Sequence, residues 1–556
     1  MKHDEIQMKA PVIDLLYPSE QQRRAMQRRR NVLAERSDTF SDDLMLEALG
    51  KLICSNNAYR MCAILQELPD DIEVITYRQD ILDDLLNVPE LSIMLKKVID
   101  TMIMNDKRDI YKLSAPDSFT SLNSATEAFE AYIECMEIIH SFYIERGNNI
   151  NSVGISKLLR FFEDRYNNKH YQELCEDVKE LRRSIRHRIR SITVAINVDE
   201  NLVPMSAGIV GISDEPYAAK PSVLDRIIYH GAKFSANTFM DNIHERYIFE
   251  NGDRYSKDKI VNDIEQPLFD DLDHITKKYV KLIEQALSEY QAIGFDEVKS
   301  IDYQLEFYMG LLQLRQTAEY KGLKMCRPKL LPMNEHSARI KGVFDIIYFN
   351  EANLYNLRNK DKRKVITNDI TLDNNGGFYL LTGANNGGKT TFVRAVGVCQ
   401  ILAQAGFFVP AEECEISVCD CIYTHFPKEE QKGIDSSKFT SEIKQFKTII
   451  DNITENSLLL MNESIQSTTP TECVDIASRL VELFAGKGVR GIFATHLIDL
   501  AMKVDELNKK AVCGSVLKSI VSTVDENGER SYVIKEGKPM KNSFAENVLR
   551  EFGIKL

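Results

Sequence analysis

The sequence predicts a multi-domain protein in which long helices with a small β insertion precede a C-terminal α/β domain of the P-loop type. Apolar residues recur at helical spacing over most of the first 320 residues, whereas short strands alternate with helices after residue 326. A glycine-rich strand-to-helix turn at 383–390 fits the P-loop spacing G-x-x-x-x-G-K-[ST]. We expect an N-terminal helical region over 1–110, long helices over 111–325 with the β insertion near 191–218, and the α/β domain over 326–556.

The composition is typical of a globular protein with several domains. Of the 556 residues, 44% are hydrophobic and 28% are charged, and no apolar run approaches the roughly 18 residues of a membrane span. The polar N-terminus has no signal-peptide character. The eleven cysteines include no CxxC pair. Cys419 and Cys421, expected on one face of a strand, suit free core thiols better than the alternative, a zinc site. We therefore expect a cytoplasmic protein without a membrane partner.

The N-terminal half is predicted to be helical with one interruption. Helical periodicity runs from Asp43 to about Asn105, with a strongly amphipathic helix over 74–86, and continues from about Ser124 to Arg190. Alternating β-branched residues at 192–198 and a second short run at 208–212 predict the β insertion. Helix is expected again over 261–293 and 301–320.

Two clusters of arginines stand out in a chain whose net charge is −13. The first comprises Arg23, Arg24, Arg28, Arg29 and Arg30, and the second comprises Arg182, Arg183, Arg186, Arg188 and Arg190. On a helix, Arg182, Arg186 and Arg190 share one face. Each cluster has two interpretations: a solvated helix face paired with neighbouring acids, or a surface that contacts nucleic-acid phosphates.

The C-terminal region alternates strands with helices. Strands are predicted at 343–349, 378–382, 458–461 and 491–495, and helices at 390–404, 438–452 and 471–484. This alternation behind a P-loop implies a three-layer α/β nucleotidase domain.

The P-loop predicts a nucleoside triphosphate site. Its residues are Gly383, Ala384, Asn385, Asn386, Gly387, Gly388, Lys389, Thr390 and Thr391. Backbone N–H groups of such a loop close around phosphate oxygens at a helix N-terminus. Lys389 is expected to reach the β- and γ-phosphates, and the Thr390 hydroxyl to ligate Mg²⁺. A glycine-rich turn that binds nothing is the alternative, which the flanking strand and helix disfavour.

Two later strands end in polar residues that suit the same site. The apolar strand before Asn462 and Glu463 has the form of a Walker B segment. Asn462 can hydrogen-bond a water ligand of Mg²⁺ but cannot offset its charge. Glu463 is the candidate general base, with a strand-end acid as the alternative. His496 follows the next strand, where it could sense the γ-phosphate or serve the structure alone.

These segments, in order and spacing, resemble the ATPase domain of the MutS DNA mismatch-repair family. The resemblance rests on 382–391, 406–411, Ser437-Lys438-Phe439 with Glu442, 459–463 and 494–496. It covers about 326–556 and extends more weakly upstream, where the helices and the β insertion look like core, lever and clamp regions.

The resemblance implies an ABC-type ATPase that uses ATP and Mg²⁺ and works as a homodimer. ATP would lie between the P-loop of one subunit and Ser437 of the other, with Glu463 as catalytic glutamate and His496 as switch histidine. Read alone, Ser437 belongs to a helix N-cap. ATP binding and hydrolysis would drive the lever helices to open and close around DNA.

The sequence also departs from the family pattern. Asn462 stands where the family has Asp, and 464–470 replaces a glycine-rich run and ends in Pro470, which has no N–H to donate. We expect the chain to lack the mismatch-reading and connector domains before the helices and the nuclease-like domain of some MutS paralogues after Leu556.

Two functions follow from these observations. The first is an ATP-dependent DNA-binding protein that acts in mismatch repair or recombination-related transactions without reading mismatches, with Arg182, Arg186 and Arg190 on the DNA backbone. The alternative is a nucleotide-switched protein that binds a protein or ribonucleoprotein and hydrolyses ATP slowly or not at all. The net charge of −13 and the neutral Asn462, which would favour long-lived ATP-bound states, motivate this alternative. No acceptor site for a small-molecule kinase is evident, so ATP is the only small-molecule substrate expected.

Overall fold

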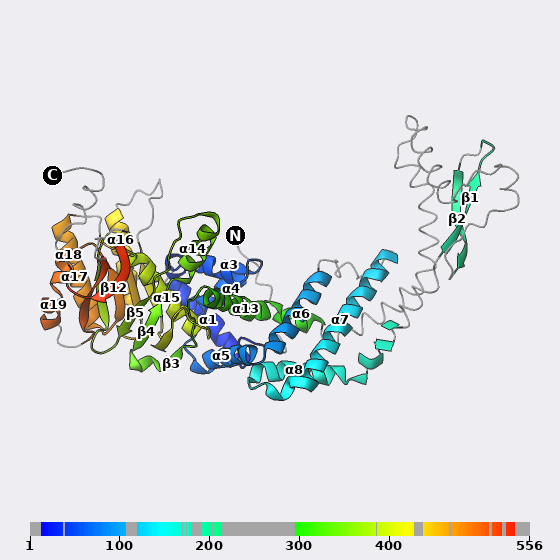
Figure 1. Cartoon of the computed structure of the whole chain (residues 1–556), viewed down its shortest axis with the longest axis horizontal. Helices are drawn as coiled ribbons and strands as arrows, with labels where there is room; N and C mark the ends of the chain where they lie inside the picture. Colours follow the sequence, from blue (N-terminus) through cyan, green and yellow to red (C-terminus); the bar gives the residue numbers. More distant parts are fainter. Residues whose placement is uncertain are drawn as a thin grey trace. The chain divides into compact units, whose positions relative to one another are not determined.

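The computed structural model describes residues 13–36, 39–106, 119–169, 171–173, 175–176, 178–179, 191–201, 204–213, 295–384, 386–426, 438–465, 469–510, 514–524 and 530–539 (Figure 1). The chain forms two compact units that interleave along the sequence. The first unit takes residues 1–92, 149–157 and 300–556, and the second takes 93–148 and 158–299.

A six-stranded sheet forms the centre of the first unit. Its strand order is β12-β11-β6-β10-β9-β8, parallel throughout except for β12, which pairs antiparallel with β11. The strands are β6 (Phe378–Thr382), β8 (Ile422–His425), β9 (Leu458–Asn462), β10 (Arg490–Ala494), β11 (Leu517–Val524) and β12 (Arg530–Glu536). Every residue of β6, β9 and β10 is buried, as expected for parallel strands with both faces covered. The predicted strands at 378–382, 458–461 and 491–495 are thus confirmed.

The helices that follow these strands are α15 (Lys389–Gln404), α16 (Lys438–Asn452), α17 (Pro470–Gly486), α18 (Ile498–Met502) and α19 (Val504–Lys510). They confirm the three predicted helices of this region. Pro470 occupies the first turn of α17, where a missing N–H costs nothing, behind a capping box of Thr469 and Glu472.

The first unit also contains a second sheet of four strands, which the sequence patterns did not predict. Its order is β3 (Lys329–Leu331), β7 (Glu413–Ser417), β4 (Ala338–Val343) and β5 (Asn368–Leu372), and a short 3₁₀ helix, η3 (Met333–Glu335), follows β3. The prediction of a strand over 343–349 is wrong, because α14 (Ile346–Arg358) begins there. The Asp345 carboxylate accepts hydrogen bonds from the N–H groups of Ile347 and Tyr348, so this N-cap overrides the β-branched run.

Cys419 and Cys421 lie in the connection between β7 and β8, which corrects their expected place on one strand. Both are buried free thiols, and the Cys419 thiol donates to the side-chain oxygen of Gln404 at 3.0 Å. Within the described ranges no group of three or more His, Cys, Asp or Glu residues could hold a metal ion. As buried free thiols, Cys419 and Cys421 match the expectation of core thiols.

N-terminal helices complete the first unit. They are α1 (Glu20–Arg36), α2 (Phe40–Asp43), α3 (Leu46–Ile53), α4 (Ala58–Gln66) and α5 (Ile72–Asn87), together with most of α13 (Phe295–Tyr320). Arg78 of α5 is fully buried and donates to the carbonyl oxygen of Ala405, directly after α15, and to the Glu67 carboxylate. The Tyr17 hydroxyl also donates to Glu67. The hydrogen bond to Ala405 therefore ties α5 to the end of the P-loop helix, while the buried ion pair ties α5 to the residue after α4.

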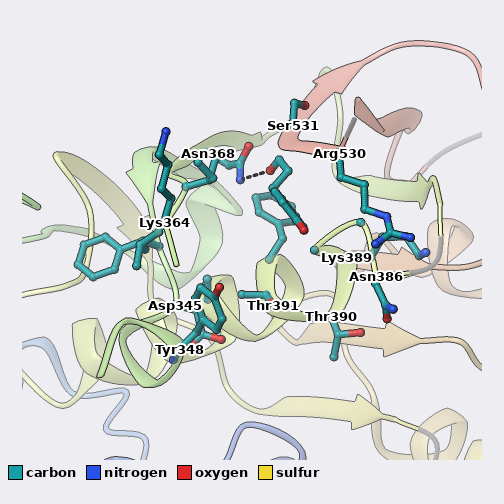
Figure 2. Close-up of a pocket in the computed structure, with 18 of the residues that line it drawn as sticks. Asp345, Tyr348, Lys364, Asn368, Asn386, Lys389, Thr390, Thr391, Arg530 and Ser531 are labelled. Carbon is teal, nitrogen blue, oxygen red and sulfur yellow. Dashed lines mark hydrogen bonds between the residues drawn. The ribbon is translucent and has the colours of Figure 1, made fainter. Parts of the chain in front are cut away.

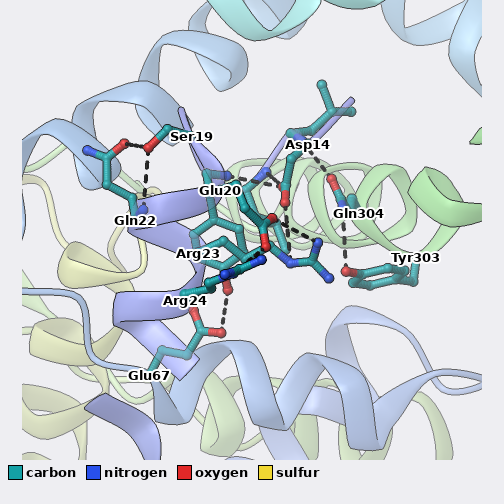
Figure 3. A network of polar contacts seen from close by, with 12 residues as sticks. Asp14, Ser19, Glu20, Gln22, Arg23, Arg24, Glu67, Tyr303 and Gln304 are labelled. Carbon is teal, nitrogen blue, oxygen red and sulfur yellow. Dashed lines mark hydrogen bonds and ion pairs between the residues drawn. The ribbon is translucent and has the colours of Figure 1, made fainter. Parts of the chain in front are cut away.

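Several arginines of the N-terminal cluster pair with acids and carbonyls of their own unit, and Figure 3 shows Arg23 and Arg24 among these contacts. Arg24 donates to Glu20 at 2.8 Å, and the Arg23 side chain lies 3.8 Å from Asp14. Arg29 pairs with Asp70 and donates to the Asp420 carbonyl oxygen at 2.7 Å. These three arginines pair with acids of their own unit, as the first interpretation expected, but only Arg24 of the three lies on a solvated face, since Arg23 and Arg29 are each 16% exposed.

The second unit contains the remaining helices and the β insertion. Its strands are β1 (Ser191–Val198) and β2 (Pro204–Ser213), and it contains all of α7 (Phe119–Arg146). It also contains most of α6 (Pro89–Asp106), most of the 3₁₀ turn η2 (Gly147–Asn149) and most of α8 (Val153–Tyr166). The two strands pair antiparallel, which confirms the predicted insertion. The expected helix over 261–293 lies outside the described residues. Among the described helices, none has the length and apolar character that crossing a membrane requires.

Candidate nucleotide-binding site

A cavity of about 990 Å³ opens over the N-terminus of α15 (Figure 2). Residues 386–392 form its floor, and Glu463 lies at one side. The start of α14, the loop 362–368 and residues 530–532 of β12 complete the lining. The P-loop, Glu463 and two segments that the sequence did not point to therefore surround one space.

The backbone of the P-loop is shaped for close approach of a ligand. Gly388 has φ +83°, a left-handed conformation that favours glycine, and it directly precedes the helix. A Cβ on Gly387 would lie 2.9 Å from the Ala384 carbonyl oxygen, so only glycine fits there. Ser522 of β11 donates from its hydroxyl to the Gly387 carbonyl oxygen at 2.6 Å and braces the loop from behind. Asn385 lies outside the described residues.

The Lys389 ammonium group is buried inside the loop. Its exposed fraction is 3%, and it donates to the carbonyl oxygens of Gly383 at 3.1 Å and Ala384 at 2.9 Å. Burial lowers the pKa of Lys389, and the nearby Glu463 charge opposes that shift. The hydrogen-bond acceptors that hold this buried cation are neutral carbonyl oxygens, which do not offset its charge. The site therefore suits an anionic ligand such as a phosphate.

The Thr390 hydroxyl and the Asn462 side-chain oxygen lie 3.1 Å apart at the edge of this loop. Asn462 is buried at the end of β9, and Thr390 is in the first turn of α15. Both groups offer neutral oxygens, the kind of ligand that Mg²⁺ accepts in combination with phosphate oxygens. The structure thus brings together the two residues that we expected at a metal ion.

Glu463 and His496 form a direct pair. The Nε2 atom of His496 lies 2.6 Å from a Glu463 carboxylate oxygen, and both side chains are about one-third exposed. The Glu463 backbone has φ +48°, and its N–H donates to the Ala494 carbonyl oxygen at 2.7 Å. Non-glycine residues adopt this conformation only when their surroundings impose it. Two parallel strand ends therefore hold Glu463 in a strained position facing the cavity.

A second histidine, which the sequence did not indicate, supports this strand end. The Nδ1 atom of His425, at the end of β8, lies 2.7 Å from the Ser464 hydroxyl, which donates to the His425 carbonyl oxygen. The imidazole stacks on Phe446 with ring centroids 4.4 Å apart. Burial lowers the pKa of His425 to about 4, so the ring is neutral near pH 7. The available signal was its place at the carboxyl end of a parallel strand.

The wall contributed by β12 is also fixed by polar contacts. Asn368 donates from its side-chain amide to the Tyr532 carbonyl oxygen at 3.2 Å and accepts from the Ile534 N–H at 2.7 Å. Tyr532 has φ +58° and packs its ring against Gly388. Arg530 and Lys364 line the same space (Figure 2). The hairpin β11–β12 therefore forms one wall of the cavity beside the P-loop.

Several residues singled out from the sequence lie outside the described residues. These are Ser437, proposed to act across a dimer, and Arg182, Arg186 and Arg190, proposed to contact DNA.

Comparison with known proteins places these features in a family. The family model "MutS domain V" matches residues 379–551, and the model "MutS2 N-terminal domain" matches residues 70–320. Together the two matches take in most of the chain.

Relatives of the same family also match part of the chain. The chain is 31% identical over 209 residues to the DNA mismatch repair protein MSH2 of Saccharomyces cerevisiae, covering 37% of this chain and 21% of that protein. It is 32% identical over 195 residues to the endonuclease MutS2 of Finegoldia magna, covering 35% and 24%. It is 33% identical over 180 residues to the DNA mismatch repair protein MutS of Thermotoga petrophila, covering 31% and 23%. Each match spans about a quarter or less of the relative's own length. The two family models and these relatives together show that the chain belongs to the MutS family.

Proposed function

We propose that this protein binds Mg²⁺–ATP in the cavity over α15 and hydrolyses it slowly. One observation supports this most strongly: Lys389, Thr390 and Glu463 line one cavity, and the contacts Thr390–Asn462 and Glu463–His496 bring three separate segments of the chain together beside it. Lys389 would exchange its two carbonyl partners for the β- and γ-phosphates, which neutralise its buried charge.

The residues around the proposed metal position fit Mg²⁺ through oxygen atoms but supply little charge. Thr390 and Asn462 would hold the ion or its water ligands, and Mg²⁺ would neutralise charge on the phosphate oxygens. Because Asn462 is neutral, the ATP phosphates would provide most of the anionic ligands. We infer that this lowers the affinity for the ion and slows the reaction.

Glu463 is the proposed acceptor of the proton from the attacking water. Its carboxylate projects into the cavity and has one oxygen paired with His496, which leaves the other oxygen to orient water. His496 would hold the carboxylate until a γ-phosphate offers its nitrogen a stronger anionic partner. His425 and Ser464 would keep this strand end in position.

For the macromolecular partner we propose DNA, with two subunits acting together. The support is the family membership and the relatives named as DNA mismatch repair proteins. The MutS-like dimer would place ATP between the P-loop of one subunit and Ser437 of the other, and its long helices would move with the nucleotide state. The second candidate is a nucleotide-dependent switch that binds a protein or ribonucleoprotein; the neutral Asn462 favours it, since slow hydrolysis prolongs the ATP-bound state.

One set of measurements tests both candidates. Steady-state ATP hydrolysis is compared for the wild type, Glu463→Gln and Asn462→Asp, and DNA binding is measured with and without ATP on perfect, mismatched and branched duplexes. An ATPase that binds DNA should lose on the order of 10²-fold in rate with Glu463→Gln and show salt-dependent DNA affinity. Equal, near-zero rates for all three proteins with ATP-dependent dimerisation would favour the switch. Absence of nucleotide binding would contradict both.

A further inference from the structure

A second surface depression adjoins the nucleotide cavity. Its volume is about 1350 Å³, and it lies between the start of α16 and the helices α17, α18 and α19. His496 lines this depression, while its partner Glu463 lines the cavity. The two hollows therefore meet at the Glu463–His496 pair.

This depression, which we name the acidic groove, combines an apolar floor with excess negative charge. Five acids line it against two lysines: Glu472, Asp475, Asp499, Asp505 and Glu506 against Lys503 and Lys509. All five acids are exposed, and Ile498 and Met502 expose 36% and 44% of their surface. Three of the five acids have local cationic partners: Lys538 for Asp505 at 3.0 Å and, at i,i+4 spacing, Arg479 for Asp475 at 3.0 Å and Lys510 for Glu506 at 2.9 Å. Exposed i,i+4 pairs of this kind are weak and easily exchanged.

The cavity carries the opposite charge on its rim. Residues 358–364, which we name the basic loop, contain Arg358, Lys360, Lys362, Arg363 and Lys364 and one acid, Asp361. The loop is held in shape because the Asn356 side chain bonds both the N–H and the carbonyl oxygen of Arg363, at 2.7 and 2.9 Å. Asp361 accepts from the Tyr355 hydroxyl. All five cations are exposed, and none lies within ion-pair distance of a described acid; Lys362 donates to the carbonyl oxygens of Asn356 and Asn359, and Arg363 stacks on Tyr355. Beside the loop, Leu354 and Leu357 of α14 expose 50% and 80% of their surface.

From this complementarity we infer that the basic loop of one copy docks against the acidic groove of a second copy. The inference rests on the proposed composite site, in which residues just before α16 of one subunit cover the cavity of the other. Phe439, in the first turn of α16, lines the acidic groove. Covering the cavity would thus bring the groove of one copy to the rim that carries the basic loop of the other. The exposed leucines of α14 and the apolar floor of the groove would meet in the same contact.

A two-fold dimer makes this contact twice. In such symmetry, a loop-to-groove contact in one direction requires the same contact in reverse. Opposite charges at both contacts favour the correct pairing and speed association, whereas like charges at the same positions oppose it. The interface would therefore select a second copy of this chain in the arrangement that completes both nucleotide sites.

Variants of the full chain in which the charge of one surface is reversed test the inference. The loop variant carries Arg363→Glu with Lys364→Glu, and the groove variant carries Asp475→Lys with Glu506→Lys. Dimerisation is measured by sedimentation in the presence of Mg²⁺ and adenylyl imidodiphosphate, a non-hydrolysable ATP analogue. Each variant alone should dimerise about tenfold or more weakly than the wild type, because both contacts become like-charged. An equimolar mixture should recover nearly wild-type dimerisation, and native mass spectrometry should find mainly mixed dimers.

A matched control carries Lys321→Glu with Lys324→Glu, two exposed lysines after α13, and should dimerise as the wild type does. If the loop variant loses nucleotide binding, Arg358→Glu with Lys360→Glu replaces it, since neither residue lines the cavity. Variants that dimerise normally, or a mixture no better than either variant alone, would overturn the inference while leaving the composite site intact. A wild type that stays monomeric with the analogue would instead overturn the composite site itself.

Discussion

The hydroxyl of Thr390 and the side-chain oxygen of Asn462 lie 3.1 Å apart, which joins the first turn of the P-loop helix to the end of β9. The two groups face each other without a formal charge between them. The protein would position a divalent ion there through neutral oxygen atoms. The nucleotide phosphates would supply nearly all of the negative charge that balances the ion. The strength of ATP binding and the rate of hydrolysis should therefore depend on this pair.

Restoring a carboxylate at this position should strengthen Mg²⁺ binding. In Asn462→Asp, a negative charge within a few ångströms of the ion should lower the Mg²⁺ concentration for half-maximal ATP hydrolysis by roughly tenfold. Magnesium titrations at saturating ATP measure the effect. Asn462→Ala, which removes the oxygen, should shift the titration in the opposite direction; identical curves for all three proteins would show that residue 462 does not contact the ion or its waters.

Removing the buried ammonium should abolish tight nucleotide binding. Lys389→Ala should lower the affinity for ATP on the order of 10²-fold, because charge-assisted hydrogen bonds to two phosphates are lost. Equilibrium titration with a fluorescent ATP analogue measures this loss. The comparison variant Lys51→Ala removes an exposed lysine that pairs only with Glu47 on its own helix, and it should bind normally. Wild-type affinity in Lys389→Ala would contradict the proposed phosphate site.

His425 should make the fold sensitive to acid. Its pKa of about 4 in the folded protein lies below the value of about 6.5 expected when unfolded, so the unfolded chain binds the proton more tightly. The stabilisation is complete above pH 6.5 or so and decreases as the pH falls toward 4. Between pH 7.5 and 4.5 the wild type should lose roughly 2–3 kcal/mol more unfolding free energy than His425→Asn. Urea unfolding at several pH values tests this; parallel pH profiles for the two proteins would contradict a neutral, buried imidazole.

The buried pair of Arg78 and Glu67 should dominate the attachment of α5. Arg78→Met leaves the Glu67 carboxylate buried with the Tyr17 hydroxyl as its remaining described partner, which should cost about 3–5 kcal/mol of unfolding free energy. Adding Glu67→Gln should recover much of that loss, because the stranded charge is removed. Denaturant unfolding of the two single variants and the double variant measures the coupling. Additive losses would indicate that the two residues act independently.

The sequence was most informative where local chemistry determines the structure. The P-loop, the strand before Asn462 and the helix bounds at Lys438 and Asn452 followed from spacing and periodicity, and the structure has them at those residues. The β-branched run at 343–349 predicts a strand, but Asp345 caps the helix α14 that begins there. The bracing of Gly387 by Ser522 and the His425–Ser464 contact join residues 135 and 39 positions apart. Such pairs depend on strand order, which a periodicity argument does not supply.

The interleaving of the first unit has a consequence for how the chain is made. Arg29 and Arg78, within the first hundred residues, end their hydrogen bonds on the carbonyl oxygens of Asp420 and Ala405, more than three hundred residues later. During synthesis from the N-terminus, these early helices emerge long before the two segments whose carbonyl oxygens accept their hydrogen bonds. These helices remain exposed amphipathic segments until the more than three hundred residues between them and their partners form a closed loop. The nascent chain can therefore complete this unit only after residues 405–420 have been synthesised. Before that point its exposed helices are most prone to aggregate or to bind chaperones.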